Sequence, residues 1–380
     1  MSTYTATATV DLAAIQANLR RIGEFTNATI MTAVKADAYG HGLIPVANAA
    51  LEGGATWLGT AQLSEALAMR AAGITAPILA WLFTPHTTLL QQCIGADIDL
   101  SASDVWALEM IAGAARNEGR RARVHLEVDT GMSRGGVRLP DFEAVVDAAK
   151  TAMAAGAIDV IGVWTHLACA DEPGNESTPA QYAEFERALA VVAAAGIEVE
   201  LRHIANSAAT LTDLEHYDLV RPGLACYGLS PLAASPAELG LTPALRLTAE
   251  LATVKTVPAG AGVSYGHTFV TDHPTRIGIV PLGYGDGIPR HASNQVSVSV
   301  AGERAPIVGR ICMDQFMIDL GDIGARPGDE VVLFGSGAAG EPTAHEWAEA
   351  IGTINYEIVT RLGARIPREY VPANPEKGPR

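Results

Sequence analysis

Short apolar segments alternate with segments of helical periodicity from residue 28 to about residue 235. In the helical segments apolar residues recur three or four positions apart, as in residues 103–117, where Val105, Leu108, Ile111 and Ala112 share one face. The apolar segments predict strands at Thr29–Val34, Trp57–Thr60, Pro77–Leu82, Ile98–Leu100, Arg121–Val128, Val160–Trp164, Val199–His203 and Asp218–Arg221. Eight such units in about two hundred residues favour an α/β fold, a closed (β/α)8 barrel of TIM type. A doubly wound sheet is the alternative, but no Gly-x-Gly-x-x-Gly motif follows the first strand.

The pattern changes from about Leu241 onwards, where alternating apolar and polar residues predict a mostly antiparallel β domain with one helix near Ala344–Ile351. Its strands are predicted around Val296–Val300, Ile307–Ile311, Met317–Leu320 and Val331–Phe334. We therefore expect a barrel domain over residues 1–240 and a β-rich domain over residues 241–380. In the alternative, residues 1–10 pair with the β domain.

Both chain ends carry local signals. Thr7–Val10 predicts a short strand, and Asp11 can cap the helix that follows it. The tail Ala373–Arg380, rich in proline and charge, is expected to be frayed.

Composition narrows the possible functions. The 380 residues carry a formal net charge of -16 without a basic stripe, which argues against nucleic acid as a partner. No signal peptide is evident at the N-terminus, and no apolar run is long enough to span a bilayer, so we expect a cytoplasmic protein without a membrane partner. The four cysteines lie far apart, and no Cys/His pattern with metal spacing occurs, so we expect reduced thiols and no catalytic metal.

The most informative segment is Val34–Gly42, Val-Lys-Ala-Asp-Ala-Tyr-Gly-His-Gly, which follows the first barrel strand. Lys35 falls at the exit of that strand, backed by apolar residues, where an amine can lose its proton and form an imine with a carbonyl compound. The glycines that follow would let the backbone approach a bulky ligand closely. The alternative is a lysine at a strand end that merely reaches solvent.

Other conspicuous polar residues also fall at the predicted carboxyl ends of barrel strands, the end where such barrels carry active sites. They are Glu127, Asp129, Arg134, His166, Asn206, Ser207 and Arg221. The loops after the seventh and eighth strands offer the Ser207 hydroxyl and the backbone N–H groups of Gly223 and Leu224, which suit a phosphate. The alternative for Ser207 is an ordinary helix cap.

Several further stretches combine glycine, tyrosine and polar residues, and each alone could be a plain turn. They are Val128–Arg134, Val263–Phe269, Gly283–Gly287, Gly309–Gln315 and Thr353–Glu357. Together with the lysine segment, in this order, they resemble the motif set of the alanine racemases, enzymes that depend on pyridoxal 5'-phosphate (PLP). The resemblance extends from about Val10 to Arg368.

The resemblance implies that Lys35 holds PLP covalently and that Arg221 faces its pyridine nitrogen. The phosphate would be held by Tyr39, Ser207, Gly223, Leu224 and Tyr356. Because an arginine cannot accept a proton from the ring, negative charge at the substrate's Cα would be delocalised less far. Prompt reprotonation would then be favoured over transamination and decarboxylation.

The resemblance also implies two bases on opposite faces of the substrate, Lys35 for the D-isomer and Tyr265 for the L-isomer. Tyr265 would need cationic help to act as a phenolate, and His166, unless it is merely a core histidine, and Arg221 would supply it. Arg134 and the backbone at Met313 would hold the substrate carboxylate. A homodimer would bring Tyr265 and Met313 of one chain to Lys35 of the other, and the access channel would be lined by Tyr284, Asp171, Arg290 and Arg310.

One position departs from the family pattern. Many alanine racemases carry a carbamylated lysine where this chain has Glu127. We hypothesise that this carboxylate replaces the carbamate and orients Arg134; the alternative is a surface glutamate that points elsewhere.

The expected function is an alanine racemase with an alanine-sized pocket bounded by Tyr265 and Tyr356, supplying D-alanine for peptidoglycan. The alternatives are a serine or broad-specificity racemase, a PLP-binding protein without racemase activity and, more distantly, a PLP decarboxylase.

Overall fold

The structure, a computed structural model, describes residues 5–372, and the predicted frayed tail lies outside them. The chain divides into two compact units. The barrel unit consists of Ile15–Ala38 and Leu43–Leu241; the β unit consists of the described residues up to Ala14, Tyr39–Gly42 and the described residues from Thr242 onwards. Whether residues 1–240 and 241–380 behave as separate folding domains stays a prediction.

The barrel unit is built on parallel strands in the order β10-β2-β3-β4-β5-β6-β8-β9. Their bounds are β2 Thr29–Ala33, β3 Trp57–Gln62, β4 Ile78–Leu82, β5 Asp99–Ala102, β6 Ala122–Asp129, β8 Ile158–Trp164, β9 Leu201–His203 and β10 Leu219–Val220; the short β7 Val137–Arg138 pairs with β6. Asp218 N–H donates to Arg202 O at 3.1 Å and Arg221 N–H to Ala205 O at 2.8 Å. These bonds bring the two ends of the sheet together, so the predicted barrel is confirmed as a nearly closed one.

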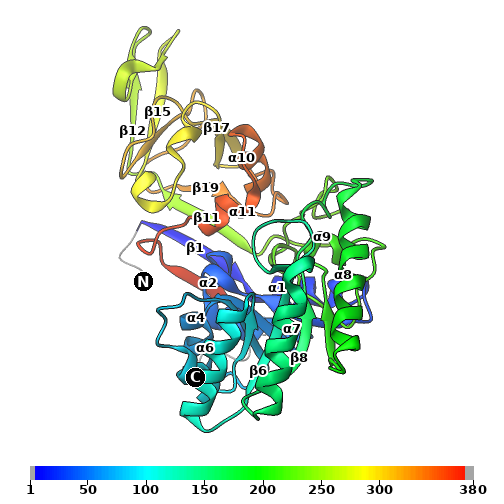
Figure 1. Ribbon diagram of the computed structural model, residues 1–380. Coiled ribbons are helices and arrows are strands. Elements are labelled where there is room, and N and C mark those ends of the chain that lie inside the picture. Colours follow the sequence, from blue (N-terminus) through cyan, green and yellow to red (C-terminus); the bar gives the residue numbers. More distant parts are fainter. Residues whose placement is uncertain (1–4, 373–380) are drawn as a thin grey trace. The chain divides into compact units, whose positions relative to one another are not determined.

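Helices lie on the outer side of these strands; Figure 1 shows α6, α7 and α8 side by side, and α6 and α7 pack on β6 and β8. The bounds are α1 Leu12–Ile22, α3 Leu43–Glu52, α4 Leu63–Ala71, α5 Leu90–Gly95, α6 Val105–Glu118, α7 Leu139–Ala154, α8 Ser177–Ala194 and α9 Ser207–Thr210. The segment labelled α2, Lys35–Tyr39, is left-handed from Ala36 onwards and is not an ordinary helix. Helix α6 buries Leu108, Ile111 and Ala112, as its periodicity predicts. It ends at Gly119, whose φ of 70° is the left-handed conformation that glycine adopts without penalty.

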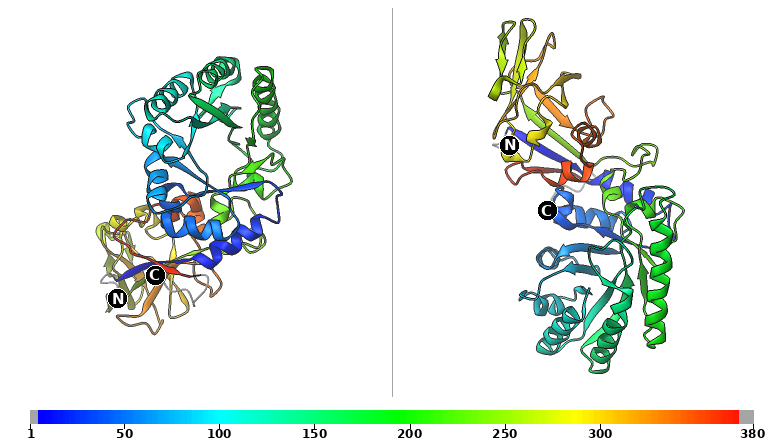
Figure 2. Two further views of the ribbon diagram at one scale, coloured as in Figure 1. Left: turned by 90° about the horizontal axis from the view of Figure 1, so that it is seen from below. Right: turned by 45° about the horizontal axis from the view of Figure 1, so that its top comes forward.

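The β unit contains a six-stranded sheet in the order β17-β16-β19-β11-β1-β20, a three-stranded sheet β12-β15-β18 and the pair β13-β14. Figure 2 shows its strands from two further directions. The bounds are β1 Ala6–Asp11, β11 Leu245–Glu250, β12 Thr253–Val257, β13 Gly262–Val263, β14 Phe269–Val270, β15 Thr275–Val280, β16 Ser297–Val300, β17 Glu303–Pro306, β18 Phe316–Asp319, β19 Glu330–Phe334 and β20 Arg368–Val371. Alternate residues of β1 are buried, and this strand pairs with β11 and β20. Asp11 accepts a hydrogen bond from Ala14 N–H at 3.0 Å, which confirms its capping role.

Two expectations for the β unit were wrong. The predicted strand Ile307–Ile311 is not one: Ile307 makes an isolated bridge to Ile318, and the ladder with β16 is formed by β17. Gly309, with a φ of 74°, interrupts the extended backbone there. Besides α10 (Ala344–Ala350) the described residues contain a second helix, α11 (Asn355–Thr360), which is too short for its periodicity to show in the sequence.

Among the described residues, we find no helix that has both the length and the apolar character needed to cross a membrane.

Candidate active site

The predicted polar residues of the barrel unit lie at the carboxyl ends of its strands. Lys35 follows β2, Glu127 lies near the carboxyl end of β6, His166 follows β8, and Ser207 and Arg221 follow β9 and β10. Their charges act on one another: Arg134, Arg221 and Lys35 all lower the pKa of His166, after burial itself. The structure therefore brings these side chains to one end of the barrel, as the sequence predicts, whereas Asp171 lies exposed in the loop between β8 and α8.

Lys35 is half-buried, and its Nζ lies 5.9 Å from the centre of the Trp81 ring. Burial lowers the pKa of this amine, and the neighbouring positive charges of Arg134 and Arg221 lower it further. Glu65 acts in the opposite direction. A larger fraction of Lys35 is therefore uncharged at neutral pH than for a solvated lysine, which is the state needed to attack a carbonyl carbon.

The backbone after Lys35 forms a left-handed turn. Ala36, Asp37, Ala38 and Tyr39 have φ values of 55°, 53°, 52° and 54°, a conformation that costs roughly 1–2 kcal/mol per residue without glycine. Asp37 N–H donates to Glu65 Oε1 at 3.0 Å, and Asp37 Oδ1 accepts from Leu43 N–H at 2.7 Å. These two bonds brace the strained turn, so strain is concentrated next to the reactive lysine.

The glycines of the lysine segment have a different use from the one expected. A Cβ on Gly40 would lie 2.4 Å from Val359 O, and a Cβ on Gly42 would lie 1.9 Å from the Tyr370 hydroxyl. At both positions the space that a Cβ would occupy is therefore filled by other residues of the same chain rather than left for a ligand. The same turn brings Tyr39 to Tyr356 of α11, with ring centres 6.1 Å apart, so these two expected phosphate ligands are neighbours within the β unit.

Arg221 is buried, with 8% of its surface exposed, and its orientation is fixed. Its NH2 group donates to Thr165 O at 2.7 Å and its NH1 group to His203 at 3.1 Å, while the guanidinium lies 4.8 Å from the Trp164 ring centre. Burial lowers the pKa of Arg221 to about 9, and the charge of Glu127 opposes this shift. The group therefore remains a cation at neutral pH and acts only as a donor.

Glu127 is also buried, with 8% exposed, so its interpretation as a surface glutamate was wrong. Burial raises its pKa to about 7, although Arg221 and Arg134 lower it. One carboxylate oxygen lies 2.8 Å from where a Cβ would stand on Gly135, the residue after Arg134. Glycine thus leaves room for this carboxylate beside the Arg134 loop.

Ser207 is not the cap of α9, because Asn206 is: its side chain accepts from Ala209 N–H at 3.1 Å. The Ser207 hydroxyl instead accepts the N–H groups of Gly223 at 2.9 Å and Ala225 at 3.3 Å. Its own proton then remains available to an anion next to the first turn of the 3-10 helix Leu224–Tyr227.

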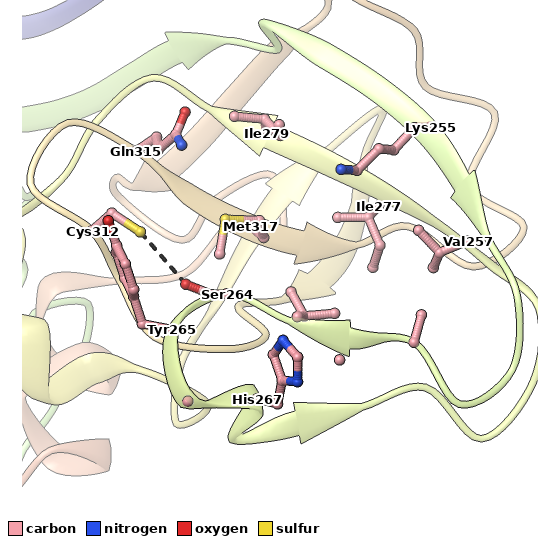
Figure 3. A pocket seen from close by; sticks show the side chains of 14 residues that line it. Lys255, Val257, Ser264, Tyr265, His267, Ile277, Ile279, Cys312, Gln315 and Met317 are labelled. Atoms are coloured by element: carbon pink, nitrogen blue, oxygen red, sulfur yellow. Dashed lines mark hydrogen bonds between the residues drawn. The ribbon is translucent and has the colours of Figure 1, made fainter.

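The remaining predicted residues lie in the β unit and are mostly exposed. The exposed fractions are 70% for Tyr265, 55% for Met313 and 42% for Tyr284, and Arg290 is exposed as well. Figure 3 shows Tyr265 beside Ser264 and Cys312. Ser264 Oγ lies 3.5 Å from Cys312 Sγ. Ser264 also donates to Arg310 O at 2.6 Å, which ties the Tyr265 segment to the segment that carries Met313.

Residues that the sequence did not single out also shape the site. Glu65, Trp81, Trp164 and His203 contact or influence Lys35 and Arg221, and none of them belongs to a motif. The sequence alone does not reveal their role, because each is an ordinary residue of a helix or strand and no pattern marks it. Within residues 5–372 no cluster of three or more His, Cys, Asp or Glu side chains is arranged to hold a metal ion.

Comparisons with known proteins agree with this arrangement. The family model "Alanine racemase, N-terminal domain" matches residues 10–231, and "Alanine racemase, C-terminal domain" matches residues 244–370. The alanine racemase of Beutenbergia cavernae is 55% identical over 373 residues, covering 97% of this chain and 98% of its own. The alanine racemase of Frankia casuarinae is 53% identical over 368 residues, covering 96% of each chain.

Solved structures give the same result. The alanine racemase of the D-cycloserine producer Streptomyces lavendulae superposes with a TM-score of 0.96 at 50% identity, covering 98% of each chain. That of Streptomyces coelicolor has a TM-score of 0.95 at 52% identity and covers 97% of this chain and 98% of its own. Both domain models, these identities over nearly full length and the same fold establish that the chain belongs to the alanine racemase family.

Proposed function

We propose that this protein interconverts L-alanine and D-alanine with covalently held PLP, supplying D-alanine for peptidoglycan. The observation that carries the proposal is Lys35, a half-buried amine of lowered pKa at the carboxyl end of β2, in a chain whose full length resembles alanine racemases. The cytoplasmic location that we propose is supported by four free cysteine thiols.

The groups at the barrel end fit PLP by their chemistry. Lys35 would bond to the aldehyde carbon, Arg221 would face the ring nitrogen, and the Ser207 hydroxyl with the backbone at Gly223 and Leu224 would hold the phosphate. Tyr39 and Tyr356, already neighbours, would add two phenol hydroxyls to the phosphate ligands. When bound, PLP withdraws electrons from the substrate's Cα and makes its proton acidic.

The chain's own residues then move that proton. Lys35 would take or return it on one face of Cα, and Tyr265 on the other. Burial and three nearby cations hold the pKa of the His166 imidazole well below its usual range and keep it neutral, so the expectation that it gives Tyr265 cationic help is wrong. His166 would support Tyr265 only as a hydrogen-bond partner, and Arg221 would remain the cationic one. Arg134, oriented by Glu127, and the Met313 backbone would hold the substrate carboxylate. Tyr284, Arg290, Arg310 and Asp171 would line the access channel.

A homodimer completes the proposal. Tyr265 and Met313 are large apolar or aromatic residues that a lone chain leaves more than half exposed. Beside them lies a groove of about 520 Å³ on the sheet β12-β15-β18, with Val263, Ile277 and Met317 in its lining (Figure 3). Such a surface is suited to a second copy, whose Lys35 would lie opposite Tyr265.

In the central test, purified protein is reconstituted with PLP and then incubated with L-alanine in heavy water. We expect an absorption band of the bound cofactor, fixed onto Lys35 by borohydride, and both alanine enantiomers carrying deuterium at Cα. L-serine in a parallel sample distinguishes a broad-specificity racemase, since a methyl pocket rejects a hydroxymethyl group by only about 1–3 kcal/mol. Retention of cofactor without deuterium exchange would instead identify a PLP-binding protein without racemase activity, and release of CO2 would identify a decarboxylase.

The pKa of Glu127 predicts a pH dependence of substrate binding. Since burial raises this pKa to about 7, the carboxyl is mostly protonated below that pH and mostly ionised above it. We expect the KM for alanine to fall roughly fivefold as pH rises through about 7, because an ionised partner strengthens a hydrogen bond by ~1 kcal/mol. In Glu127→Gln the KM should stay at the higher value and lose this dependence. An identical KM profile for both proteins would show that Glu127 does not orient Arg134.

Sharing of sites between chains predicts complementation between two inactive variants. A heterodimer of Lys35→Ala and Tyr265→Phe would contain one site with both bases and one with neither. Equal co-expression should restore roughly a quarter of the wild-type sites, because random pairing gives half heterodimers with one intact site each. No recovery despite heterodimer formation, shown by two affinity tags, would place both bases on the same chain.

A further inference from the structure

A chain of hydrogen bonds crosses the interior of the barrel unit from Arg221 to Asp99, and the proposed mechanism does not use its far end. Arg221 NH1 lies 3.1 Å from His203 Nδ1, and His203 Nε2 lies 2.9 Å from His125 Nδ1. His125 Nε2 lies 3.2 Å from Asp99 Oδ2. The exposed fractions are 0% for both histidines and 2% for Asp99. Burying three ionisable groups costs free energy unless each has a hydrogen-bond partner, and here each of the three has one. We call this chain of bonds from Arg221 to Asp99 the relay.

The guanidinium at one end fixes the direction of every bond in the relay. Arginine has donors only, so His203 Nδ1 must accept from Arg221. Burial and the charge of Arg221 hold the pKa of His203 well below its usual range, so its imidazole is neutral and its single proton sits on Nε2. His203 therefore donates to His125 Nδ1, and His125 donates through Nε2 to Asp99. The opposite direction would require a neutral arginine as acceptor.

Packing holds the rings of the relay in these orientations. The His203 ring stacks on Trp164 at an interplanar angle of 8°, and Arg221 lies over the same indole. The rings of His125 and Trp57 form a T-shaped pair with their centres 5.8 Å apart. At the far end, Arg123 Nε donates to both oxygens of Asp99, at 2.9 and 3.1 Å. Each imidazole therefore packs against a tryptophan ring.

We propose that Asp99, acting through His125 and His203, is a positioning residue that fixes the orientation of Arg221 at the cofactor ring. The inference rests on the proposed function, since Arg221 matters to catalysis only if it faces the pyridine nitrogen. An ionised carboxylate can only accept, so it completes a relay whose donors all point toward it. Its charge polarises both imidazoles, and the chain of hydrogen bonds holds the guanidinium fixed in direction.

The test uses the holoenzyme labelled with ¹⁵N-histidine, together with Asp99→Asn, which keeps the shape of the side chain but removes its charge. In the wild type we expect both His125 and His203 to be neutral with the proton on Nε2. In Asp99→Asn we expect a shift of the absorption band of the bound cofactor and a fall in kcat of about tenfold, with KM for alanine nearly unchanged, as for other residues that orient a direct ligand. The matched control is Asp97→Asn, an exposed carboxylate that pairs with Arg120 and should change neither quantity.

Several results would overturn the inference. A proton on Nδ1 of either histidine would contradict the direction of the relay. If Asp99→Asn kept the wild-type absorption spectrum and the wild-type kcat, the relay would be a purely structural network. If Asp99→Asn does not fold, His125→Gln interrupts the relay at its middle and must give the same spectral shift. A wild-type protein that binds no PLP would refute the proposed function and the positioning role with it, whereas the histidine spectra would still report the direction of the bonds.

Discussion

Lys35→Ala should lose covalently held PLP and at least about 10³-fold in kcat, since a positioned base alone contributes roughly 10²–10⁴-fold and the same amine also anchors the cofactor. Burial and the cations Arg134 and Arg221 lower the pKa of Lys35, which makes its amine a nucleophile at neutral pH. The measurement combines borohydride reduction, mass spectrometry of the labelled peptide and the rate of alanine interconversion.

The matched control for this variant is Lys150→Ala, which removes an exposed lysine of α7. It should retain the cofactor band, the labelled peptide and the wild-type rate. If the labelled peptide contained Lys150 or Lys255 instead, or if Lys35→Ala kept wild-type turnover, the assignment of Lys35 would be wrong and with it the location of the active site.

Tyr265→Phe should keep the cofactor and its colour but lose interconversion of the enantiomers by roughly 10²–10⁴-fold, because the phenol oxygen that moves a proton on one face is gone. Lys35 remains, so the other face still has its base. In heavy water we expect D-alanine to exchange its Cα proton while L-alanine does not. The measurement is the deuterium content of each enantiomer, separated by chiral chromatography.

Tyr284→Phe serves as the matched control. It removes the same hydroxyl from another tyrosine of the β unit that is next to glycine and half-exposed. Its deuterium exchange should remain symmetric between the enantiomers. Equal exchange of L- and D-alanine in Tyr265→Phe would contradict the two-base assignment, and a loss of both would indicate that Tyr265 has a structural rather than a proton-transfer role.

The barrel strands and the position of Lys35 were predictable because they rest on local patterns. Apolar segments such as Trp57–Gln62 and Ile158–Trp164 become buried parallel strands, and their carboxyl ends must share one edge of the sheet. The predicted strand around Ile307–Ile311 failed for the opposite reason. Ile307 and Ile311 are both buried, but the backbone between them turns at Gly309 instead of forming a strand of a β ladder.

The left-handed turn over Ala36–Tyr39 could not be predicted from its own residues. Alanine disfavours positive φ, and the turn persists because Glu65 of α4 and the first residue of α3 satisfy Asp37. Likewise the use of Gly40 and Gly42 depends on Val359 and Tyr370, more than 300 positions away in the chain.

By itself the sequence determined the alternation of strands and helices, the lysine at the exit of a strand and the ordered motifs that identify the family. Each of these is a property of neighbouring residues or of their spacing. Only the tertiary structure decided that Glu127 is buried beside the Arg134 loop, that Ser207 accepts two backbone N–H groups and that Asp99, His125, His203 and Arg221 form one directed relay. Burial, pKa and the choice of donor arise from groups distant in sequence, so they become fixed only when the barrel closes.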